Sequence, residues 1–337
     1  MNPLNRTLRG WLELVRPPNL FTVPGDPLAG FILAGGGGDG RFAPAVLVAL
    51  AACLLYMAGL IWNDCADARE DAHTRPSRPI PSGRVKRAHA LTVAAVMAAG
   101  AVALAWRATP TAGYVALLLA VLVLAYNFVA RRQVAAGVVS MGLCRGVSVL
   151  LGAAAAWGTQ AAGIPSSAFA LRATADRGKA GTTNGVSGVL EAFVVPPLGG
   201  NYGSYVLPWV AAGGITLYII AVSVLAHGET RRQRLGIKPW LPAAAAALLF
   251  VVAGRSNVYA VGFAGTALAW LLLRGLALRG EPEPADVQRS IGGMIRTLLL
   301  LQAALCALMP ETGLAPAMLL LAAWPLAALP GRWFYGS

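Results

Sequence analysis

The stretch PAVLVALAACLLYMAGLIW at residues 44–62 is followed directly by NDCADAREDAHTRPSRPIPSG at 63–83, so an apolar run meets a dense group of acids and arginines. A helix needs roughly 20 apolar residues to cross a bilayer, and the first run suits that length. If the helix continues, Asp64, Asp67 and Asp71 share one face, because they are spaced i, i+3 and i+7. Three carboxylates on one face repel one another unless a cation joins them. Since Mg²⁺ is usually held by one or two carboxylates and the phosphate oxygens of a substrate, the stretch predicts a magnesium–diphosphate site at a membrane surface.

Composition extends the membrane prediction to the whole chain. Hydrophobic residues make up 57% of the 337 residues and mean hydropathy is +0.63, both too high for a soluble domain of this length. The expected fold is all-α, a polytopic membrane helical bundle of nine to ten transmembrane helices around a central apolar cavity. The apolar runs that predict it are residues 17–36, 44–62, 89–106, 113–130, 136–157, 206–227, 240–254, 258–276, 293–309 and 314–329.

These runs leave no soluble domain of appreciable size, so residues 1–337 are expected to form a single transmembrane domain. The longest polar stretch, at 158–205, is rich in Gly, Ser, Thr and Pro and is predicted to be a long non-cytoplasmic loop. It is either a solvated connection or a partly ordered cap over the membrane cavity.

The distribution of charge predicts how the chain lies in the membrane. If ten spans alternate in direction, most of the 27 lysine and arginine residues fall on the side of the aspartate-rich stretch. The positive-inside rule then places both termini and that stretch on the cytoplasmic side of the cytoplasmic (inner) membrane. Although the net charge is +13, no nucleic-acid partner is expected, because the basic loops are short and carry no interleaved aromatic residues.

Another acid, Asp26, lies within the apolar run at residues 17–36. Asp26 occurs in TVPGDPLAG at 22–30, where two prolines and two glycines predict broken helical backbone. An acid inside a span is costly and is by default a functional candidate facing the bundle interior. The alternative is that Asp26 pairs with Arg145 or caps a broken helix.

Four motifs resemble the UbiA superfamily of intramembrane aromatic prenyltransferases. The stretch at 63–83 is similar to the family's first signature, NDxxDxxxD followed by RPxPSG. RPPNLFT at 16–22, YNFVARR at 126–132 and MGLCRGVSVLLG at 141–152 are similar to other family segments. The resemblance covers the first 157 residues, and its first motif is the specific one.

This resemblance implies Mg²⁺-dependent transfer of a prenyl group from an isoprenyl diphosphate donor to a small aromatic or lipid acceptor. The protein is expected to be surrounded by membrane lipids. The resemblance also implies that Asp64, Asp67 and Asp71 are the catalytic residues and, with Asn63, the metal ligands. The residues expected to bind substrate in this half of the chain are Asn19, Asn63, Arg75, Arg78 and Arg145, the last holding the diphosphate or an anionic group of the acceptor.

The second half of the chain departs from the family. A second aspartate motif of the DxxxD kind would end the sixth helix, but residues 218–234 read YIIAVSVLAHGETRRQR. His227 and Glu229 are the residues there that can replace the missing ligands, Glu229 also at the metal, with Arg231 as a phosphate partner. This pattern is similar to the UbiA-like EboC branch.

Other functions stay open because of this departure. One is transfer from a phosphoribosyl diphosphate to a polyprenyl phosphate, which needs a polar pocket for the donor rather than a long apolar tunnel. Another is a non-catalytic lipid or metabolite carrier that retains the diphosphate site. A secondary transporter is a third, suggested by the number of spans and the broken first span.

Overall fold

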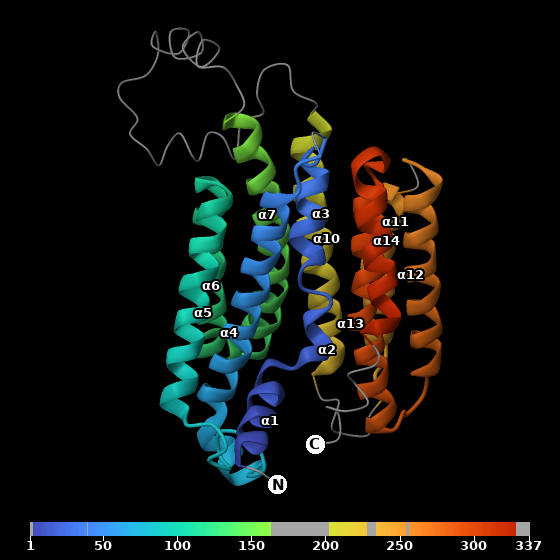
Figure 1. The fold of residues 1–337 in the computed structure, drawn as a ribbon. Helices are drawn as coiled ribbons and strands as arrows, with labels where there is room; N and C mark the ends of the chain where they lie inside the picture. The colour runs from blue at the N-terminus through green and yellow to red at the C-terminus, as the bar shows by residue number, and fades with distance from the viewer. Residues whose placement is uncertain (1–2, 39, 163–201, 228–233, 254–255, 328–337) are drawn as a thin grey trace.

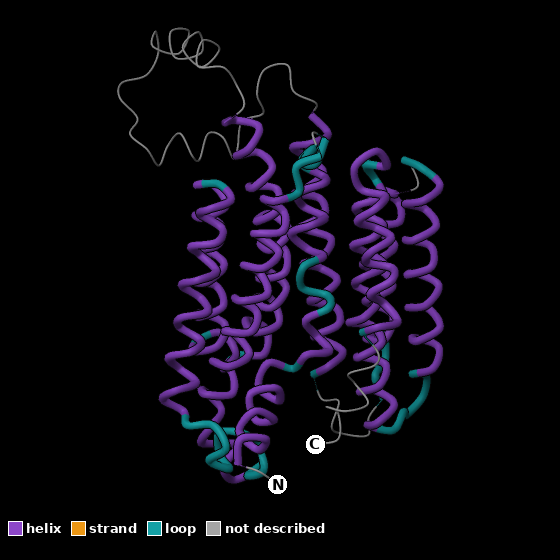
Figure 2. The backbone as a smooth tube through the Cα atoms, viewed as in Figure 1, coloured by secondary structure: helices purple, strands orange, loops and turns teal. Residues whose placement is uncertain are grey.

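The computed structural model describes residues 3–38, 40–162, 202–227, 234–253 and 256–327, and every regular element in these ranges is a helix. Successive long helices run in alternate directions and pack side by side (Figure 1). Short loops join their ends, and the described ranges contain no strand (Figure 2). The predicted all-α membrane bundle is confirmed.

Seven helices in the described part of the chain are long and apolar enough to cross a membrane. They are α4 (Ala43–Thr74), α5 (Arg87–Ala108), α6 (Pro110–Phe128), α7 (Val134–Ala162), α10 (Tyr202–Ala226), α12 (Val258–Ala277) and α13 (Pro284–Ala307). Two shorter apolar helices accompany them: α11 (Leu241–Ala253) packs against α12, and α14 (Pro310–Leu326) packs against α13. The count of nine to ten spans stays a prediction, because these two helices have 13 and 17 residues.

The first apolar run is broken, as its prolines and glycines predict. It forms a single turn, α2 (Pro17–Leu20), and then a nine-residue helix, α3 (Gly25–Leu33). Pro24 lies at the break, where its missing N–H removes one helical hydrogen bond. A preceding helix, α1 (Pro3–Val15), lies at one end of the bundle beside the end of α4 (Figure 1).

Close backbone contact holds α3 against α7. A Cβ added at Gly30 would collide with the carbonyl oxygen of Val149, and one added at Gly152 would collide with the carbonyl oxygen of Pro27. Small residues let membrane helices approach in this way, where van der Waals packing replaces the hydrophobic driving force. The short α3 is thereby fixed inside the bundle.

Helix α13 is the most enclosed of the long helices, with 83% of its apolar window buried. It packs against α3, α10, α11, α12 and α14. The hydroxyl of the fully buried Tyr218 on α10 donates to the carbonyl oxygen of Met294 on α13 at 2.6 Å. An apolar helix surrounded on all sides is the expected centre of a bundle.

The predicted loop at 158–205 is too long at both ends. Helix α7 continues to Ala162 and α10 begins at Tyr202, so the first and last residues of the predicted loop are helical. Gln160, one of these residues, donates from Nε2 to the carbonyl oxygen of Ala34 at 2.9 Å and so anchors the last turn of α7 to the end of α3. The remainder of the loop, 163–201, lies outside the described residues.

The alternating helices place four chain segments at one end of the bundle. These are the end of α4, the short helix η1 (Ala130–Arg132), the turn that contains η2 (Lys238–Trp240), and the turn from α12 to α13 (Figure 1). Most of the basic residues of the chain belong to this end. The number of spans and the orientation of this end in the membrane stay predictions.

Candidate functional site

The aspartate-rich stretch continues the helix of the apolar run. Helix α4 has 32 residues and ends at Thr74, so Asp64, Asp67 and Asp71 lie on its last turns, on one face as predicted. Asp64 and Asp71 are 6% and 5% exposed, although they lie at the end of a helix. Buried carboxylates require ionic or hydrogen-bonding partners, and the structure supplies arginines from three other segments.

Arg78 bridges two of these aspartates. Its Nη1 atom lies 2.8 Å from Oδ2 of Asp71 and 3.7 Å from Oδ1 of Asp64. The turn after α4 positions it: the Arg78 N–H donates to the carbonyl oxygen of Arg75, and the Arg78 carbonyl accepts from the N–H of Ser82. The RPSRPIPSG segment therefore folds back over the acidic end of the helix, and the predicted role of Arg78 at this site fits its position.

Arg16 reaches the same cluster from the opposite side. Its Nη2 atom donates to Oδ1 of Asp64 at 3.0 Å. The backbone of Arg16 is left-handed, with φ 46° and ψ 67°, and no other non-glycine residue in the described ranges has a positive φ. Such a conformation costs about 1–3 kcal/mol and persists where the surroundings impose it, often at functional sites. Here it turns the chain from α1 into α2 and places the guanidinium over α4.

The third aspartate pairs with the segment that follows α6. Arg131, in η1, forms an ion pair with Oδ1 of Asp67, and Asn63 Nδ2 donates to Oδ2 of the same carboxylate at 3.2 Å. Asn63 thus orients Asp67, which lies four residues later on the same helix, and this contact accounts for the amide at the start of the motif. We call the three aspartates together with Arg16, Arg78 and Arg131 the acid–arginine cluster.

Sequence reasoning did not select Arg16 or Arg131 as site residues. Both belong to segments that resemble the family, RPPNLFT and YNFVARR, but nothing in their spacing places either arginine beside the aspartates. One feature of the sequence could have identified the two arginines: both basic segments are expected at the same membrane surface as the aspartates.

The acid–arginine cluster has the features of a site for a polyanion with a divalent cation. Its arginine side chains are 39%, 26% and 26% exposed, so their donors are accessible from the end of the bundle. Guanidinium groups bind phosphate bidentately. The described residues contain no group of three His, Cys, Asp or Glu side chains placed to hold a metal by themselves. The predicted magnesium site at these aspartates therefore stays a prediction.

Three other predicted residues lie near the ends of these helices. Asn19, in α2, is half-buried, and its N–H donates to the carbonyl oxygen of Arg16 at 3.1 Å. Arg75 is exposed, and its N–H caps α4 by donating to the carbonyl oxygen of Asp71 at 2.8 Å. His227 is exposed just after α10. Glu229, Arg231 and Arg232 lie outside the described residues, so their roles stay predictions.

The structure places Arg145 in a separate polar group inside the bundle. Its Nε atom lies 2.7 Å from Oδ2 of Asp26, and its Nη2 donates to the carbonyl oxygen of Thr22 at 2.9 Å. Gln302 on α13 donates to the same carbonyl oxygen at 2.8 Å and to Oδ1 of Asp26 at 2.6 Å. The pairing of Asp26 with Arg145 is the simpler of the two alternatives considered for Asp26. It joins α3, α7 and α13 where the first span is broken.

The fold and the cluster together define a class of protein. It is an intramembrane helical bundle with a carboxylate-rich and arginine-rich site where its helices meet the aqueous surface. Such a site suits a ligand with an anionic head and an apolar body.

The sequence profile of the UbiA prenyltransferase family matches residues 27–291, and the chain belongs to this family. Among its relatives are digeranylgeranylglyceryl phosphate synthases of three archaea. The Methanoculleus marisnigri enzyme is 28% identical over 44% of this chain and 52% of its own. The Methanosarcina barkeri enzyme is 30% identical over 44% and 56%, and that of Natronomonas pharaonis is 32% identical over 50% and 61%. The chain thus spans little more than half the length of these relatives.

Two solved structures share the fold. A UbiA homolog from Aeropyrum pernix K1 superposes with a TM-score of 0.59 and 19% identity, covering 85% of this chain and 96% of its own. A structure described as giving insights into the biosynthesis of digeranylgeranylglyceryl phosphate synthase in membranes has a TM-score of 0.55 and 16% identity, covering 90% and 99%. At these identities the likeness establishes the fold, and the assignment to the EboC branch stays a prediction.

Proposed function

We propose that the protein is a Mg²⁺-dependent intramembrane transferase that moves a prenyl group from an isoprenyl diphosphate to a lipid acceptor. The observation that carries this proposal is the acid–arginine cluster: Asp64, Asp67 and Asp71 on one helix face, contacted by arginines from three separate segments. A member of this family with such a cluster has the parts needed to bind an allylic diphosphate at its anionic end.

The reaction breaks the bond between the allylic carbon and the diphosphate oxygen, and the electron pair leaves with the diphosphate. The acceptor nucleophile then forms a bond to that carbon and loses its proton. Bound Mg²⁺ neutralises charge on the leaving diphosphate. The protein must hold the diphosphate, keep water away from the allylic cation and present the acceptor.

In this proposal the arginines exchange partners when the donor binds. Arg78 and Arg16 share Asp64, and Arg131 pairs with Asp67. When a diphosphate binds, the guanidinium groups turn to its oxygens, and Asp64, Asp67 and Asp71 would then be available to hold Mg²⁺. Because Asp64 and Asp71 are buried, the exchange requires a cation to replace the arginines as their partner.

The relatives support a lipid acceptor over a small aromatic one. Their name describes the product of a synthase as a glyceryl phosphate with two geranylgeranyl groups. We therefore place a polyprenyl glyceryl phosphate, or a lipid of similar form, first among acceptors. The excess of basic residues at the end of the bundle that holds the cluster supports its placement on the cytoplasmic side of the inner membrane.

The test uses full-length protein in nanodiscs with radiolabelled geranylgeranyl diphosphate, Mg²⁺ and a geranylgeranylglyceryl phosphate acceptor. The expected result is pyrophosphate release and a prenylated lipid product, both abolished by a chelator. In Asp67→Asn, turnover is expected to fall by about 100-fold or more, since catalytic electrostatic groups contribute on that scale. The control Asp286→Asn removes an acid whose exposed ion pair with Arg289 lies at the start of α13, and it should leave turnover unchanged.

A parallel reaction supplies phosphoribosyl diphosphate with a polyprenyl phosphate acceptor. If the protein turned over only this pair of substrates, the donor in the proposed function would be a sugar diphosphate rather than a prenyl diphosphate. Tight magnesium-dependent binding of the prenyl donor without pyrophosphate release would instead favour a carrier. Full activity in Asp67→Asn would remove this aspartate from the mechanism.

A further inference from the structure

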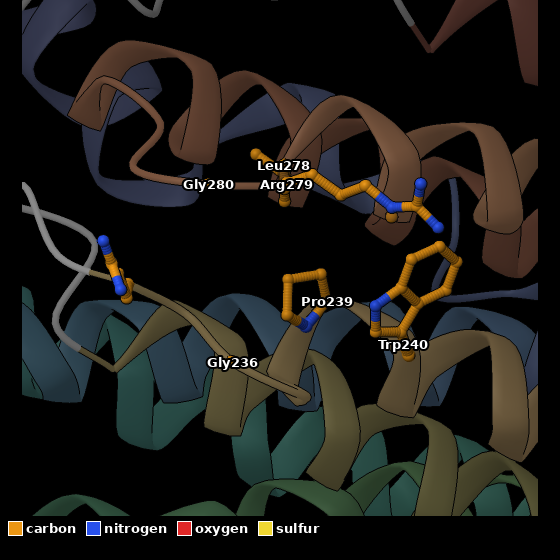
Figure 3. A pocket seen from close by; sticks show the side chains of 8 residues that line it. Gly236, Pro239, Trp240, Leu278, Arg279 and Gly280 are labelled. Atoms are coloured by element: carbon orange, nitrogen blue, oxygen red, sulfur yellow. The ribbon is translucent and has the colours of Figure 1, made fainter.

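A pocket of about 300 Å³ lies at the same end of the bundle as the acid–arginine cluster but on other helices. One wall comes from the turn that leads through η2 into α11, and the other from the end of α12 and the turn after it (Figure 3). Helix η2 packs against α10, α11 and α12, whereas the aspartates and their partners belong to α4, η1 and the segments beside α1. The pocket is therefore separate from the proposed prenyl-transfer site.

Glycines keep both edges of this pocket open. Gly236 and Gly280 have φ values of 58° and 84°, a left-handed conformation that glycine adopts without strain. A Cβ added at either residue would meet no other atom within 4 Å, so both border open space. Backbone N–H groups at such turns are accessible to a ligand that a larger side chain would exclude.

The ionisable side chains that line the pocket are both arginines. The guanidinium of Arg279 lies over the ring of Trp240, 5.3 Å from its centroid, and Figure 3 shows the two side chains facing each other across one end of the pocket. Stacking engages the face of the guanidinium and leaves its in-plane N–H donors for an anion. Arg234 lines the pocket from the other turn.

An acidic residue beside the pocket does not block it. Glu281 pairs with Nε of Arg234 at 3.0 Å, and the two side chains are 52% and 85% exposed. Exposed ion pairs of this kind contribute between nothing and about 1 kcal/mol. A phosphate group can therefore take over the donors of Arg234 at little cost.

The position of the pocket indicates what kind of anion reaches it. Trp240 ends η2 directly before the apolar helix α11, a position typical of residues at a membrane–water interface, and Trp270 lies two turns before the end of α12. Arg274 stacks on Trp270 at 4.6 Å and lies within electrostatic range of Arg289 and Arg296. Basic pockets between membrane helices at this depth bind lipid headgroups.

We propose that this pocket binds the phosphate-ester headgroup of an anionic lipid. Arg279 and Arg234 supply the cationic donors for the phosphate, the glycerol unit lies against Gly236 and Gly280, and the acyl chains extend past the exposed side chain of Ile237. A soluble phosphate ester offers the same chemistry, and the experiment separates the two sources. No magnesium and no prenyl diphosphate enter this proposal, so it stands apart from the proposed function.

The experiment measures binding to full-length protein in a neutral detergent without Mg²⁺. The probes are dihexanoylphosphatidylglycerol, dihexanoylphosphatidylcholine and glycerol 3-phosphate, followed by native mass spectrometry and by the shift in thermal unfolding. For the phosphatidylglycerol we expect saturable binding that weakens at least tenfold in Arg279→Gln and in Arg234→Gln. The matched control is Arg107→Gln, an exposed arginine at the end of α5 on the opposite side of the bundle. Asp67→Asn should also bind as the parent protein does.

Each outcome decides the proposal. Binding of the phosphatidylglycerol but not of glycerol 3-phosphate, lost in both arginine variants, supports a lipid headgroup. Equal binding of dihexanoylphosphatidylglycerol and glycerol 3-phosphate would overturn the proposal that the ligand is a lipid, and would leave a site for phosphate esters in general. The variant Arg279→Lys keeps the positive charge but loses the planar donors. It should bind the phosphatidylglycerol with an affinity between those of the parent protein and Arg279→Gln. Binding unchanged in both glutamine variants, or equally strong for the phosphatidylcholine, overturns the proposal.

Discussion

Nη2 of Arg16 lies 3.0 Å from Oδ1 of Asp64, although the two residues are 48 positions apart and the backbone of Arg16 is left-handed. This contact fixes the start of the first span against the acidic end of α4. Because the cluster holds a phosphate in the proposed function, Arg16 is expected to move from Asp64 to the donor diphosphate.

Arg16→Gln is expected to raise the KM for geranylgeranyl diphosphate by about tenfold to a hundredfold, since a hydrogen bond to a charged group contributes roughly 1.5–3 kcal/mol. Its effect on kcat should be smaller. Because Asp64 is buried, losing one of its two arginine partners should also lower the unfolding temperature, although Arg78 remains 3.7 Å from the same carboxylate oxygen. The control is Arg9→Gln, which removes an exposed arginine that pairs with Glu13 within α1. An unchanged KM would exclude Arg16 from donor binding.

Asp67 and Arg131 are expected to act as a unit. Each single variant, Asp67→Asn and Arg131→Gln, should lower kcat/KM, and the double variant should be no worse than the more damaged single variant. Contacting residues in one ionic network characteristically give coupling energies of about 0.5–3 kcal/mol. Steady-state kinetics on the four proteins measure the coupling. Strictly additive losses would show that Arg131 and Asp67 act independently.

The predictable part of this site is the part that one helix carries. Asp64, Asp67 and Asp71 share a face because of helical periodicity alone, so their spacing was sufficient to group them. Arg78 was also expected at the site, because the resemblance of RPSRPIPSG to the family signature implies that it binds phosphate.

Arg16 and Arg131 could not be selected by spacing, because their contacts with α4 depend on how distant helices pack. For Arg145 the sequence left two partners open, Asp26 and an anionic group of a substrate, and the packing of α3 on α7 brings Arg145 to Asp26. The number of spans was equally hard to derive, since short apolar helices such as α11 give weak signals. Helical periodicity predicts on which face of its helix a residue lies, whereas tertiary packing determines which other residues contact that face.

The ion pair between Asp26 and Arg145 is expected to stabilise the bundle. Arg145→Gln leaves a carboxylate without its cation at a fully buried position, and breaking a buried pair typically costs about 3–5 kcal/mol. Asp26→Asn should destabilise similarly, whereas the double variant should recover part of the loss because neither charge is left alone. Unfolding in detergent, followed by circular dichroism, measures this. Equal stability of all four proteins would contradict a structural role for the pair.

The contact between α3 and α7 predicts that alanine is not tolerated at Gly152. Its added Cβ would meet the carbonyl oxygen of Pro27, and backbone cannot move aside as a flexible side chain can. Overpacking of this kind costs about 1–3 kcal/mol, which exceeds the roughly 1 kcal/mol that alanine gains over glycine within a helix. Gly152→Ala should therefore lower the unfolding temperature and disturb donor binding by displacing the broken first span.

The matched control for Gly152 is Gly262, a glycine in α12 whose added Cβ would meet no atom within 4 Å. Gly262→Ala should leave stability unchanged or raise it slightly, because only the helix propensity differs. If the two alanine variants unfolded at the same temperature, close backbone contact between α3 and α7 would not be what holds the first span in place. A lowered unfolding temperature in Gly152→Ala alone, and a similar loss in Gly30→Ala on the facing helix, would assign the effect to that contact.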